Sequence, residues 1–500
     1  MKRRSILLYL TLFGLAVLTY RNGLHISYYH DDYERLFSHP GKVVFEGFVS
    51  ANSLDHFYRP IEHAVLAVIQ ALWGRDTFPL RMLHLLLHAG IAMLVFRILC
   101  AWKVHLIPAF SAAVFVIISQ LSVYAIASNN TLSQLMATLF SGLSLWFFHG
   151  YLIAEKRRSE LSKYISSVLF FFLALLSKEA SSFLLIAIPF VLVINRKRNK
   201  SSCDSMRASA LQLVPYAGCF VFYLVLRIRS GSSMPMFSSS AYYSYHFGFN
   251  IIKNVVLIAG QTFLPLSSLT VWASLKTHAY QAIVVFALYT TPFLFIVGNG
   301  LRKSLRKKII VIIFVCIVIG WLPVIMLTWL TECYAYSSII FVALLVGIAA
   351  DHYWSNIDNE SMLIAILATI IFFTSGITNI IGVNEKVCLM KLQGDRADTL
   401  LPQVIRIAKG MPQNSWMYFV HPKKTEIAHR RFIMQFFTVL DNGDSVVSFY
   451  AQRPDVHLFT GDSLAYRDFS KIHAGIAFTC DIKTLQIYPF KNQKYSRVFQ

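Results

Sequence analysis

The sequence predicts an all-α polytopic membrane protein with about eleven transmembrane helices, followed by a small extracytoplasmic α/β domain at its C-terminus. Of the 500 residues, 56% are hydrophobic and 14% are charged, a balance that excludes an ordinary soluble globular protein. Several apolar runs reach the roughly 20 residues that a helix needs to cross a bilayer. Because lysines and arginines gather in short loops, the net charge of +21 indicates membrane topology and not nucleic-acid binding.

The N-terminus predicts a first helix that is retained in the membrane. Residues 1–4 are Met-Lys-Arg-Arg, and the apolar run that follows ends at Tyr20 without the small residues of a signal-peptide cleavage site. The basic residues place the N-terminus in the cytoplasm. Residues 21–78 then form a long outer loop. Within it, residues 60–73 begin with proline and are too short to span, which favours an interfacial helix.

The remaining spans follow from apolar runs between basic turns. Basic clusters at 155–163, 196–200 and 302–308 mark cytoplasmic turns. The run 164–194 is interrupted only at Ser177-Lys178-Glu179, so it is expected to cross out and back and to leave Lys178 outside. Further spans are expected at about residues 79–102, 106–127, 132–153, 210–226, 309–330, 337–354 and 362–381.

Two segments are assigned by counting membrane crossings, since each crossing moves the chain to the other side of the membrane. The run 250–271 contains Gln261 and Pro265 and could span or lie in the outer leaflet. Only a non-spanning run puts the basic cluster 302–308 inside, so we expect one. The turn 351–360 is then also inside, although it is acidic.

The chain divides into a membrane domain of residues 1–381 and an outer domain of residues 382–500, where the composition becomes mixed and polar. A helical stripe covers 395–409, and residues 416–420 and 445–450 are typical of short strands. Cys388 and Cys480 are the cysteines of this domain, and they could form a disulfide in an oxidising compartment or remain thiols. The domain is expected on the outer face of the plasma membrane, or of the inner membrane if the protein is bacterial.

Charged residues gather on the predicted outer face. Asp31 and Asp32 follow the first helix closely and could act as a general base, bind a cation or belong to a solvated loop. Their neighbours favour a catalytic or binding role, because the predicted topology brings five further polar or charged residues to the same face: Arg59, His63, Lys178, Glu179 and Glu332. Cations and carboxylates together suit a reaction in which an anionic phosphate leaves while a hydroxyl loses a proton.

Four motifs on this face resemble those of the GT-C glycosyltransferases. They are the pair Asp31-Asp32, Tyr58-Arg59-Pro60, Leu175-Leu176-Ser177-Lys178-Glu179-Ala180, and Thr331-Glu332-Cys333-Tyr334-Ala335-Tyr336-Ser337-Ser338. The resemblance covers about residues 1–380 and is closest to the tetratricopeptide-containing transmembrane O-mannosyltransferases, with the protein O-mannosyltransferases and the aminoarabinose transferase acting on lipid A more distant. Cys333 replaces the arginine of the family's fourth motif, and no tetratricopeptide repeat follows residue 382.

The resemblance implies roles for individual residues. Asp31 takes the place of the general base, and Asp32 orients the acceptor or shares the proton. Lys178 and Arg59 are expected to bind the phosphate of the donor. The alternatives are that Lys178 snorkels at a helix end and that Arg59 pairs structurally with Asp31 or Glu62.

A weaker set of substrate-binding candidates comprises His63, Glu179, Arg81, His84, Glu332 and Tyr336. Arg81, His84 and His88 share one face of the predicted second helix, where polar groups are costly unless they are paired. A metal would need further ligands beyond these histidines, so we expect neither a metal nor another cofactor. The expected partners are a polyprenyl-phosphate-linked sugar donor, an acceptor glycan, lipid or protein, and the bilayer, with no nucleic acid.

The sequence therefore predicts an inverting glycosyltransferase that moves a sugar from a polyprenyl-phosphate donor to an acceptor hydroxyl on the extracytoplasmic face. Two other classes remain open. A transporter or flippase of a lipid-linked or small solute also carries intramembrane charges, but no repeat of the Asp31 or Lys178 neighbourhood occurs in the second half. A non-catalytic subunit of an envelope assembly would not need its charged outer residues.

Overall fold

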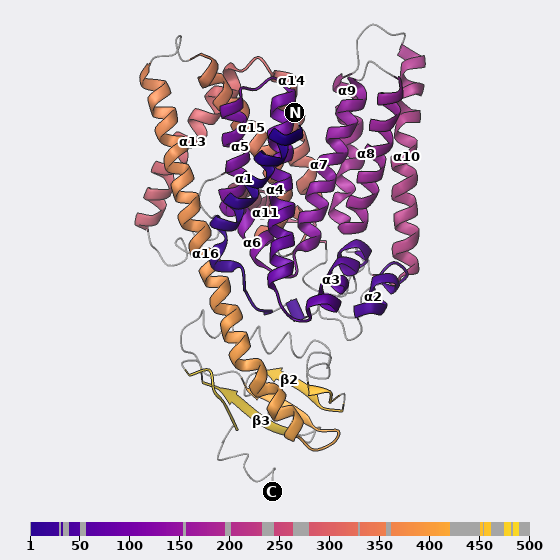
Figure 1. The fold of residues 1–500 in the computed structure, drawn as a ribbon, viewed down its shortest axis with the longest axis vertical. Helices are drawn as coiled ribbons and strands as arrows, with labels where there is room; N and C mark the ends of the chain where they lie inside the picture. The colour runs from indigo at the N-terminus through magenta and orange to yellow at the C-terminus, as the bar shows by residue number, and fades with distance from the viewer. Residues whose placement is uncertain are drawn as a thin grey trace.

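The protein is an integral membrane protein whose helical bundle carries a small mixed sheet at one end, as the computed structural model shows (Figure 1). The fold class expected from the sequence is confirmed. The structure describes residues 2–29, 32–33, 40–50, 57–153, 157–195, 202–232, 245–263, 280–328, 331–356, 362–420, 451–453, 455–461, 475–481 and 484–489.

The N-terminal part consists of α1 (Lys2–Thr19) and the outer loop that follows it. The loop carries the short helices η1 (Arg21–Gly23) and α2 (Pro40–Glu46), and α3 (Pro60–Trp73) has the bounds that the sequence predicts. Proline opens α3 because its fixed φ and missing N–H suit the first helical position. Gly74, at φ 62°, ends α3 with an N–H bond to the Gln70 carbonyl. In Figure 1, α2 and α3 lie at the end of the bundle that faces the sheet.

The bundle is built from helices that follow the predicted apolar runs. They are α4 (Phe78–Ala101), α5 (Leu106–Ile118), η3 (Gln120–Ser122), α6 (Val123–Ala127), α7 (Leu132–Leu152), α8 (Arg157–Ser177), η4 (Glu179–Phe183), α9 (Leu184–Asn195), α10 (Ser202–Arg229), α11 (Phe249–Phe263), α13 (Tyr280–Lys303), α14 (Lys307–Ile325), η6 (Glu332–Ser338), α15 (Ile339–Ser355) and α16 (Met362–Gly410).

Within the described residues, seven helices are long and apolar enough to cross a membrane, or eight if one bent pair counts as a single span. The apolar part of α1, Ser5–Thr19, and the apolar segment Glu179–Ile194, which includes most of α9, are shorter. The expected total of about eleven spans stays a prediction. So does the non-spanning run 250–271, because α11 has only 15 residues but residues 264–271 lie outside the described part.

Two breaks interrupt helices of the bundle. The run 106–127, expected as one helix, bends by 44° after α5. There Ser119 is extended and its side chain accepts a hydrogen bond from the Leu121 N–H, which competes with the helical ladder. Lys178 is also extended, with φ −159° and ψ 132°, so α8 and α9 separate at the residue where the sequence predicts a turn.

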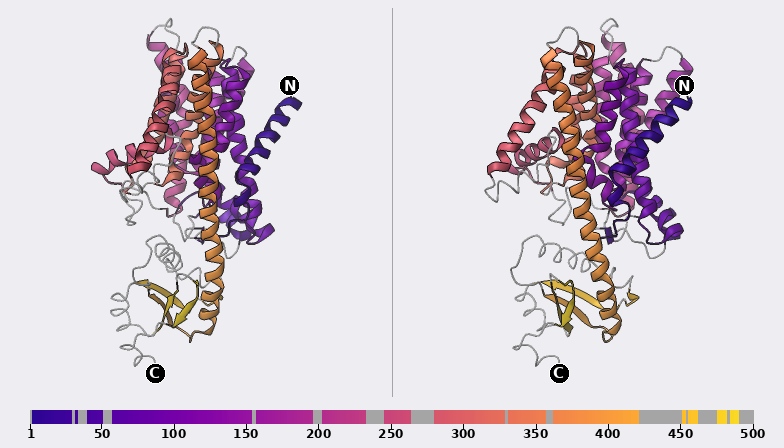
Figure 2. Two further views of the ribbon diagram at one scale, coloured as in Figure 1. Left: turned by 90° about the vertical axis from the view of Figure 1, so that its left-hand side faces the viewer. Right: turned by 60° about the vertical axis from the view of Figure 1, so that its left-hand side comes forward.

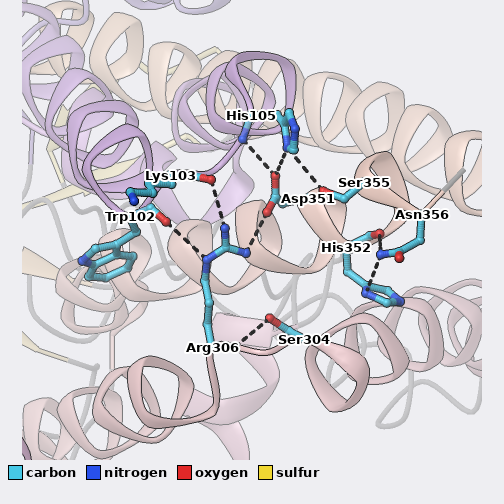
Figure 3. A network of polar contacts seen from close by, with 9 residues as sticks. All are labelled: Trp102, Lys103, His105, Ser304, Arg306, Asp351, His352, Ser355 and Asn356. Carbon is cyan, nitrogen blue, oxygen red and sulfur yellow. Dashed lines mark hydrogen bonds and ion pairs between the residues drawn. The ribbon is translucent and has the colours of Figure 1, made fainter.

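Asp351 of α15 joins that helix to the residues just before α5 and α14 (Figure 3), at the end of the bundle away from the sheet (Figure 1). Its Oδ1 accepts a bond of 2.9 Å from the His105 backbone N–H and lies 2.7 Å from His105 Nδ1, and its Oδ2 accepts one of 2.7 Å from Arg306 Nη1. Arg306 also donates to the Lys103 carbonyl over 3.0 Å. The last turns of α15, which include Asp351, and the basic cluster 302–308 therefore share one end of the bundle.

Helix α16 is one continuous helix of 49 residues that leaves the bundle and reaches the sheet (Figure 2). The sequence instead predicts a span that ends near 381 and a separate helix over 395–409. Gly382 and Gly394 do not interrupt α16. A Cβ at Gly382 would collide with the Gln120 side chain, and one at Gly394 would lie 3.0 Å from the Ser27 backbone nitrogen. Both glycines serve close packing.

The sheet has four strands in the order β2-β1-β3-β4, formed by β1 (Trp416–Val420), β2 (His457–Gly461), β3 (Gly475–Cys480) and β4 (Ile487–Pro489). β1 pairs in parallel with β2 and β3, and β4 is antiparallel to β3. The predicted strand 416–420 is confirmed, whereas 445–450 lies outside the described residues. Cys388 and Cys480 are both free thiols.

Candidate functional site

Asp32 lies in the loop that follows α1, with only 1% of its surface exposed. Its Oδ2 accepts hydrogen bonds from the Tyr29 N–H (3.2 Å) and Asn129 Nδ2 (3.0 Å), and its Oδ1 accepts one from the Asn130 N–H (3.1 Å). The carboxylate thus ties the outer loop to the turn before α7. Asp31, the expected base, lies outside the described residues.

Arg81 continues this network into the bundle, where it is fully buried. Its Nη2 donates to the Ala127 carbonyl over 2.7 Å and to Asn129 Oδ1 over 2.9 Å. Asn129 therefore bridges the guanidinium of Arg81 and the carboxylate of Asp32. A buried cation and a buried carboxylate that share hydrogen-bond partners offset each other's desolvation.

His84 and His88 lie one and two turns further along α4 and are fully buried. His84 Nδ1 lies 3.0 Å from the Ile126 carbonyl, and His88 Nδ1 lies 2.7 Å from the Tyr336 hydroxyl. Tyr20 packs edge-on against the His88 ring. These contacts give the two histidines and Tyr336 an interior role that connects α1, α4 and η6.

Arg59 is held by carboxylates. Its Nη2 and Nε donate to the two carboxylate oxygens of Glu179 over 2.8 and 3.2 Å, and its Nη1 lies 3.9 Å from Glu62. Burial alone would raise the pKa of Glu179, but the Arg59 guanidinium holds that pKa well below its usual range. The structural pairing considered for Arg59 therefore involves Glu179 and Glu62.

Glu62 and His63 begin α3 and are both buried, at 0% and 1% exposure. Glu62 Oε1 accepts a bond of 3.1 Å from the Ser133 N–H in the first turn of α7. A carboxylate at that position accepts a hydrogen bond from a backbone N–H that has no partner within the helix. Its negative charge also interacts favourably with the positive end of the helix dipole. Glu62 therefore fixes α3 against α7.

Lys178 contrasts with Arg59 because its ammonium has no such partner. It is 6% exposed and lies 5.3 Å above the centre of the Tyr334 ring. Within the described residues the Lys178 ammonium makes no hydrogen bond and no ion pair. Burial, and next the neighbouring Arg59 charge, lower its pKa. A buried ammonium in this state is a strong candidate for binding an anion.

Arg227 of α10 is a third cation at this place, and the sequence analysis missed it. It is 3% exposed, its Nη1 donates to the Tyr223 hydroxyl over 3.0 Å, and its charge acts on Glu179. The signal was present, because Arg227 and Arg229 end a helix that is predicted to exit on the outer face, where the positive-inside rule disfavours arginine.

Together these groups form a cluster of three cations and two carboxylates, which we call the cation cluster: Arg59, Glu62, Lys178, Glu179 and Arg227. It carries one net positive charge. It adjoins the Asp32 network at the start of α7, where Asn130 binds Asp32 and Ser133 binds Glu62.

Glu332 lies apart from the cation cluster, in η6. It is 7% exposed, and both its oxygens accept hydrogen bonds from Lys386 of α16, over 3.0 and 2.8 Å. Cys333 replaces the arginine that the resemblance leads one to expect, and Lys386 supplies the cation next to this carboxylate. Glu332 thus fastens α16 to the bundle.

Comparison with known proteins extends the description of the fold. No family model and no curated protein matches the sequence. ArnT from Cupriavidus metallidurans, solved with undecaprenyl phosphate bound, matches with a TM-score of 0.54 and 13% identity over 94% of this chain and 93% of that one. The apo form of the same protein matches over the same shares with a TM-score of 0.52 and 13% identity.

At this identity the likeness shows the fold alone, and it confirms the GT-C fold that the motifs predict. The finer resemblance to the O-mannosyltransferases gains no support from these comparisons. The likeness covers both the bundle and the sheet, since it spans almost the whole of each chain.

Proposed function

We propose that the protein is a membrane glycosyltransferase that moves a sugar from a polyprenyl-phosphate donor to an acceptor hydroxyl on the extracytoplasmic face. The observation that carries the proposal is Lys178, a buried ammonium without a hydrogen-bond partner in the described part, set beside Arg59 and Arg227. The fold adds support, because a structure of the same fold holds undecaprenyl phosphate. Binding of a phosphate would compensate the buried charge of Lys178.

The reaction then requires three events at this end of the bundle. The acceptor oxygen attacks the anomeric carbon, and the bond from that carbon to the phosphate oxygen breaks on the opposite face, so the configuration inverts. The acceptor proton passes to a carboxylate, for which Asp31 remains the proposed base. The electron pair of the broken bond leaves with the polyprenyl phosphate, whose charge Lys178 and its neighbours stabilise.

Arg59 was expected to bind the donor phosphate, and the proposal now gives it a positioning role. Glu179 already occupies two of its donors, so we assign Arg59 and Glu179 to positioning the cluster and Lys178 to direct phosphate contact. Asp32 likewise has its oxygens engaged by the outer loop and the turn before α7, and we assign it to shaping the loop that carries Asp31.

The test is the release of polyprenyl phosphate from lipid-linked sugars by the purified protein. Lys178→Met is expected to lower kcat/KM for the donor by about 10- to 100-fold, because a charge-assisted hydrogen bond contributes roughly 1.5–3 kcal/mol. Lys391→Met is the matched control, since Lys391 is an exposed lysine of α16. Equal donor use by both variants would remove Lys178 from the site. Solute or lipid transport without donor cleavage by the wild type would favour the transporter class instead.

A further inference from the structure

Tyr334 supports the Lys178 ammonium, so the position of Tyr334 bears on the proposed donor site. The ammonium lies 5.3 Å above the centre of the Tyr334 ring, within the range of a cation–π contact. The face of an aromatic ring attracts a cation without neutralising it, so the ammonium keeps its charge for an anion. Whatever fixes Tyr334 therefore also fixes the charge that we propose to bind the donor phosphate.

Tyr334 belongs to η6, whose shape depends on contacts with the rest of the bundle. η6 is a 3-10 helix of seven residues, Glu332–Ser338. Such helices rarely exceed three or four residues, because their hydrogen bonds have poorer geometry than those of an α-helix. The backbone of η6 alone therefore does not explain its length, and side-chain contacts must hold it.

Three side chains of η6 are each bound by a different helix. Glu332 binds α16 through its ion pair, and the Tyr336 hydroxyl binds α4. Ser338 Oγ accepts a hydrogen bond of 2.9 Å from Trp321 Nε1 of α14. Tyr334 lies between Glu332 and Tyr336 in the chain, so two of these contacts flank it.

The contact with α4 is the bond between His88 and Tyr336. His88 Nδ1 lies 2.7 Å from the Tyr336 hydroxyl, and both side chains are fully buried. Because α4 is a membrane-spanning candidate, a polar side chain within it is costly unless it is paired. A buried polar pair of this kind specifies one arrangement of the elements that it joins. The bond therefore sets η6 against α4.

We propose that His88 and Tyr336 are positioning residues of the donor site, because their bond sets η6 so that Tyr334 supports the Lys178 ammonium where the donor phosphate binds. This inference rests on the proposed function. Neither residue touches the phosphate. Loss of the bond leaves the charge of Lys178 in the cation cluster but displaces it, and a displacement of about 1 Å is enough to impair a site strongly.

Two ligands that differ only in the phosphate test the positioning role. His88→Leu and Tyr336→Phe should each weaken the binding of polyprenyl phosphate to the full-length protein by about tenfold, measured by titration calorimetry. Both variants should bind the corresponding polyprenol like the wild type, because the alcohol carries no charge for Lys178. An equal loss of affinity for the two ligands would show a general loosening of the bundle and would overturn the proposal.

Tyr216→Phe is the matched control. Tyr216 of α10 is 2% exposed and donates to Ser167 Oγ of α8 over 2.7 Å, so the change removes a buried tyrosine hydrogen bond of the same length outside η6. This variant should bind polyprenyl phosphate like the wild type. A loss as large as that of Tyr336→Phe would overturn the proposal, since any buried tyrosine bond would then have the same effect.

A conservative variant and a double variant test the hydrogen bond itself. His88→Asn should restore the affinity for polyprenyl phosphate to within about threefold of the wild type, because an amide can replace Nδ1 as the partner of the hydroxyl. The combination of His88→Leu with Tyr336→Phe should lose no more than His88→Leu alone. Failure of asparagine together with additive losses would show that the two residues act separately, against the proposal.

The thiol of Cys333 reports on η6 without any donor. Cys333 is the second residue of η6 and is 8% exposed. With every other cysteine of the chain replaced by alanine, a small maleimide should label Cys333 about tenfold faster in His88→Leu than in the wild type or in Tyr216→Phe, because η6 opens more often. Unchanged labelling would show that the bond does not hold η6.

Labelling and donor use together separate this inference from the function on which it rests. Faster labelling in His88→Leu, with unchanged release of polyprenyl phosphate relative to an active wild type, would overturn the positioning role and keep the glycosyltransferase. Faster labelling in a protein whose wild type neither binds polyprenyl phosphate nor cleaves any donor would overturn the glycosyltransferase and the donor role of the pair. Only the anchoring of η6 would then remain.

Discussion

At the scale of single residues, the acidic pair divides into two different carboxylates. Asp32 accepts three backbone or amide hydrogen bonds of 3.0–3.2 Å. Asn in its place would turn an NH₂ group toward at least one of these donors and leave Arg81 without its nearest carboxylate. We expect Asp32→Asn to destabilise the protein by about 1.5–3 kcal/mol, measured as a lower Tm of the purified protein.

Asp31→Asn is the counterpart and should behave in the opposite way. It is expected to keep the wild-type Tm and to lose transfer by roughly 10² to 10⁴, the range for removing a general base. If Asp31→Asn kept full transfer while a stable Asp32→Asn variant were inactive, Asp32 would be the general base and Asp31 would not.

The Arg59–Glu179 pair gives a prediction for pH. The folded pKa of Glu179 lies below its usual value of 4.5, so its contribution to stability is present above that value and is lost as pH falls toward the folded pKa. The Tm difference between the wild type and Glu179→Gln should therefore stay constant from about pH 7 to about pH 5 and shrink at lower pH. A difference that already shrinks at about pH 6 would show that Glu179 is not held by Arg59.

The sequence predicted Arg59 and Lys178 as functional residues but not what each contacts. Two of the partners of Asp32, Asn129 and Asn130, lie almost 100 residues further along the chain, and Glu179 lies 120 residues from Arg59. No local pattern indicates pairs so distant, because only the packing of α3, α7 and α8 brings them together. Arg227 was missed for the same reason, although its place at the end of a helix that is predicted to exit on the outer face was visible.

At the scale of elements, α16 depends on a cap that its own sequence does not supply. Arg453, near the sheet, donates to the Ala408 and Met411 carbonyls at the end of the helix, over 3.3 and 3.1 Å. Asp455 holds the guanidinium by two bonds of 2.8 Å. The cap satisfies carbonyls that a helix end leaves free.

Arg453→Ala should therefore loosen the junction of α16 and the sheet, and chymotrypsin should cleave the purified protein there faster. Arg453→Lys should lie between Ala and the wild type, because an ammonium cannot reproduce the planar fork that binds several carbonyls and Asp455 at once. Lys391→Ala, in the exposed part of the same helix, is the control and should be cleaved like the wild type. Full protection by lysine would show that charge alone caps the helix.

Helix α16 also shows what the sequence could and could not predict. The bounds of α3 and β1 followed from a proline start and from a short hydrophobic run. The continuity of α16 did not, because the composition becomes mixed and polar from residue 382 and two glycines, Gly382 and Gly394, lie within the helix. Their role becomes visible only when Gln120 and Ser27 are seen packed against them.

At the scale of the whole molecule, contacts between distant segments show which of them lie at the same end of the bundle. The start of α1 meets the end of α4 through Ser5 and Arg97, and Arg306 binds the chain just after α4 and also Asp351. The start of α1, the turn after α4, the basic cluster 302–308 and the end of α15 therefore lie at one end of the bundle. The cation cluster, which includes Arg59 and Glu62 at the start of α3, lies with the sheet at the other end, where α16 leaves the bundle (Figures 1 and 2).

Which end faces the cytoplasm follows from the basic residues, and labelling tests it. Leu305 is 99% exposed in the basic cluster 302–308, and Gln413 is exposed between α16 and β1. In a cysteine-free background, a membrane-impermeant maleimide added to intact cells should label Gln413→Cys, and it should label Leu305→Cys only after permeabilisation. Because the two sites lie at opposite ends of one bundle, the reverse pattern would turn the whole molecule over. The cation cluster would then face the cytoplasm, and transfer on the outer face would be impossible.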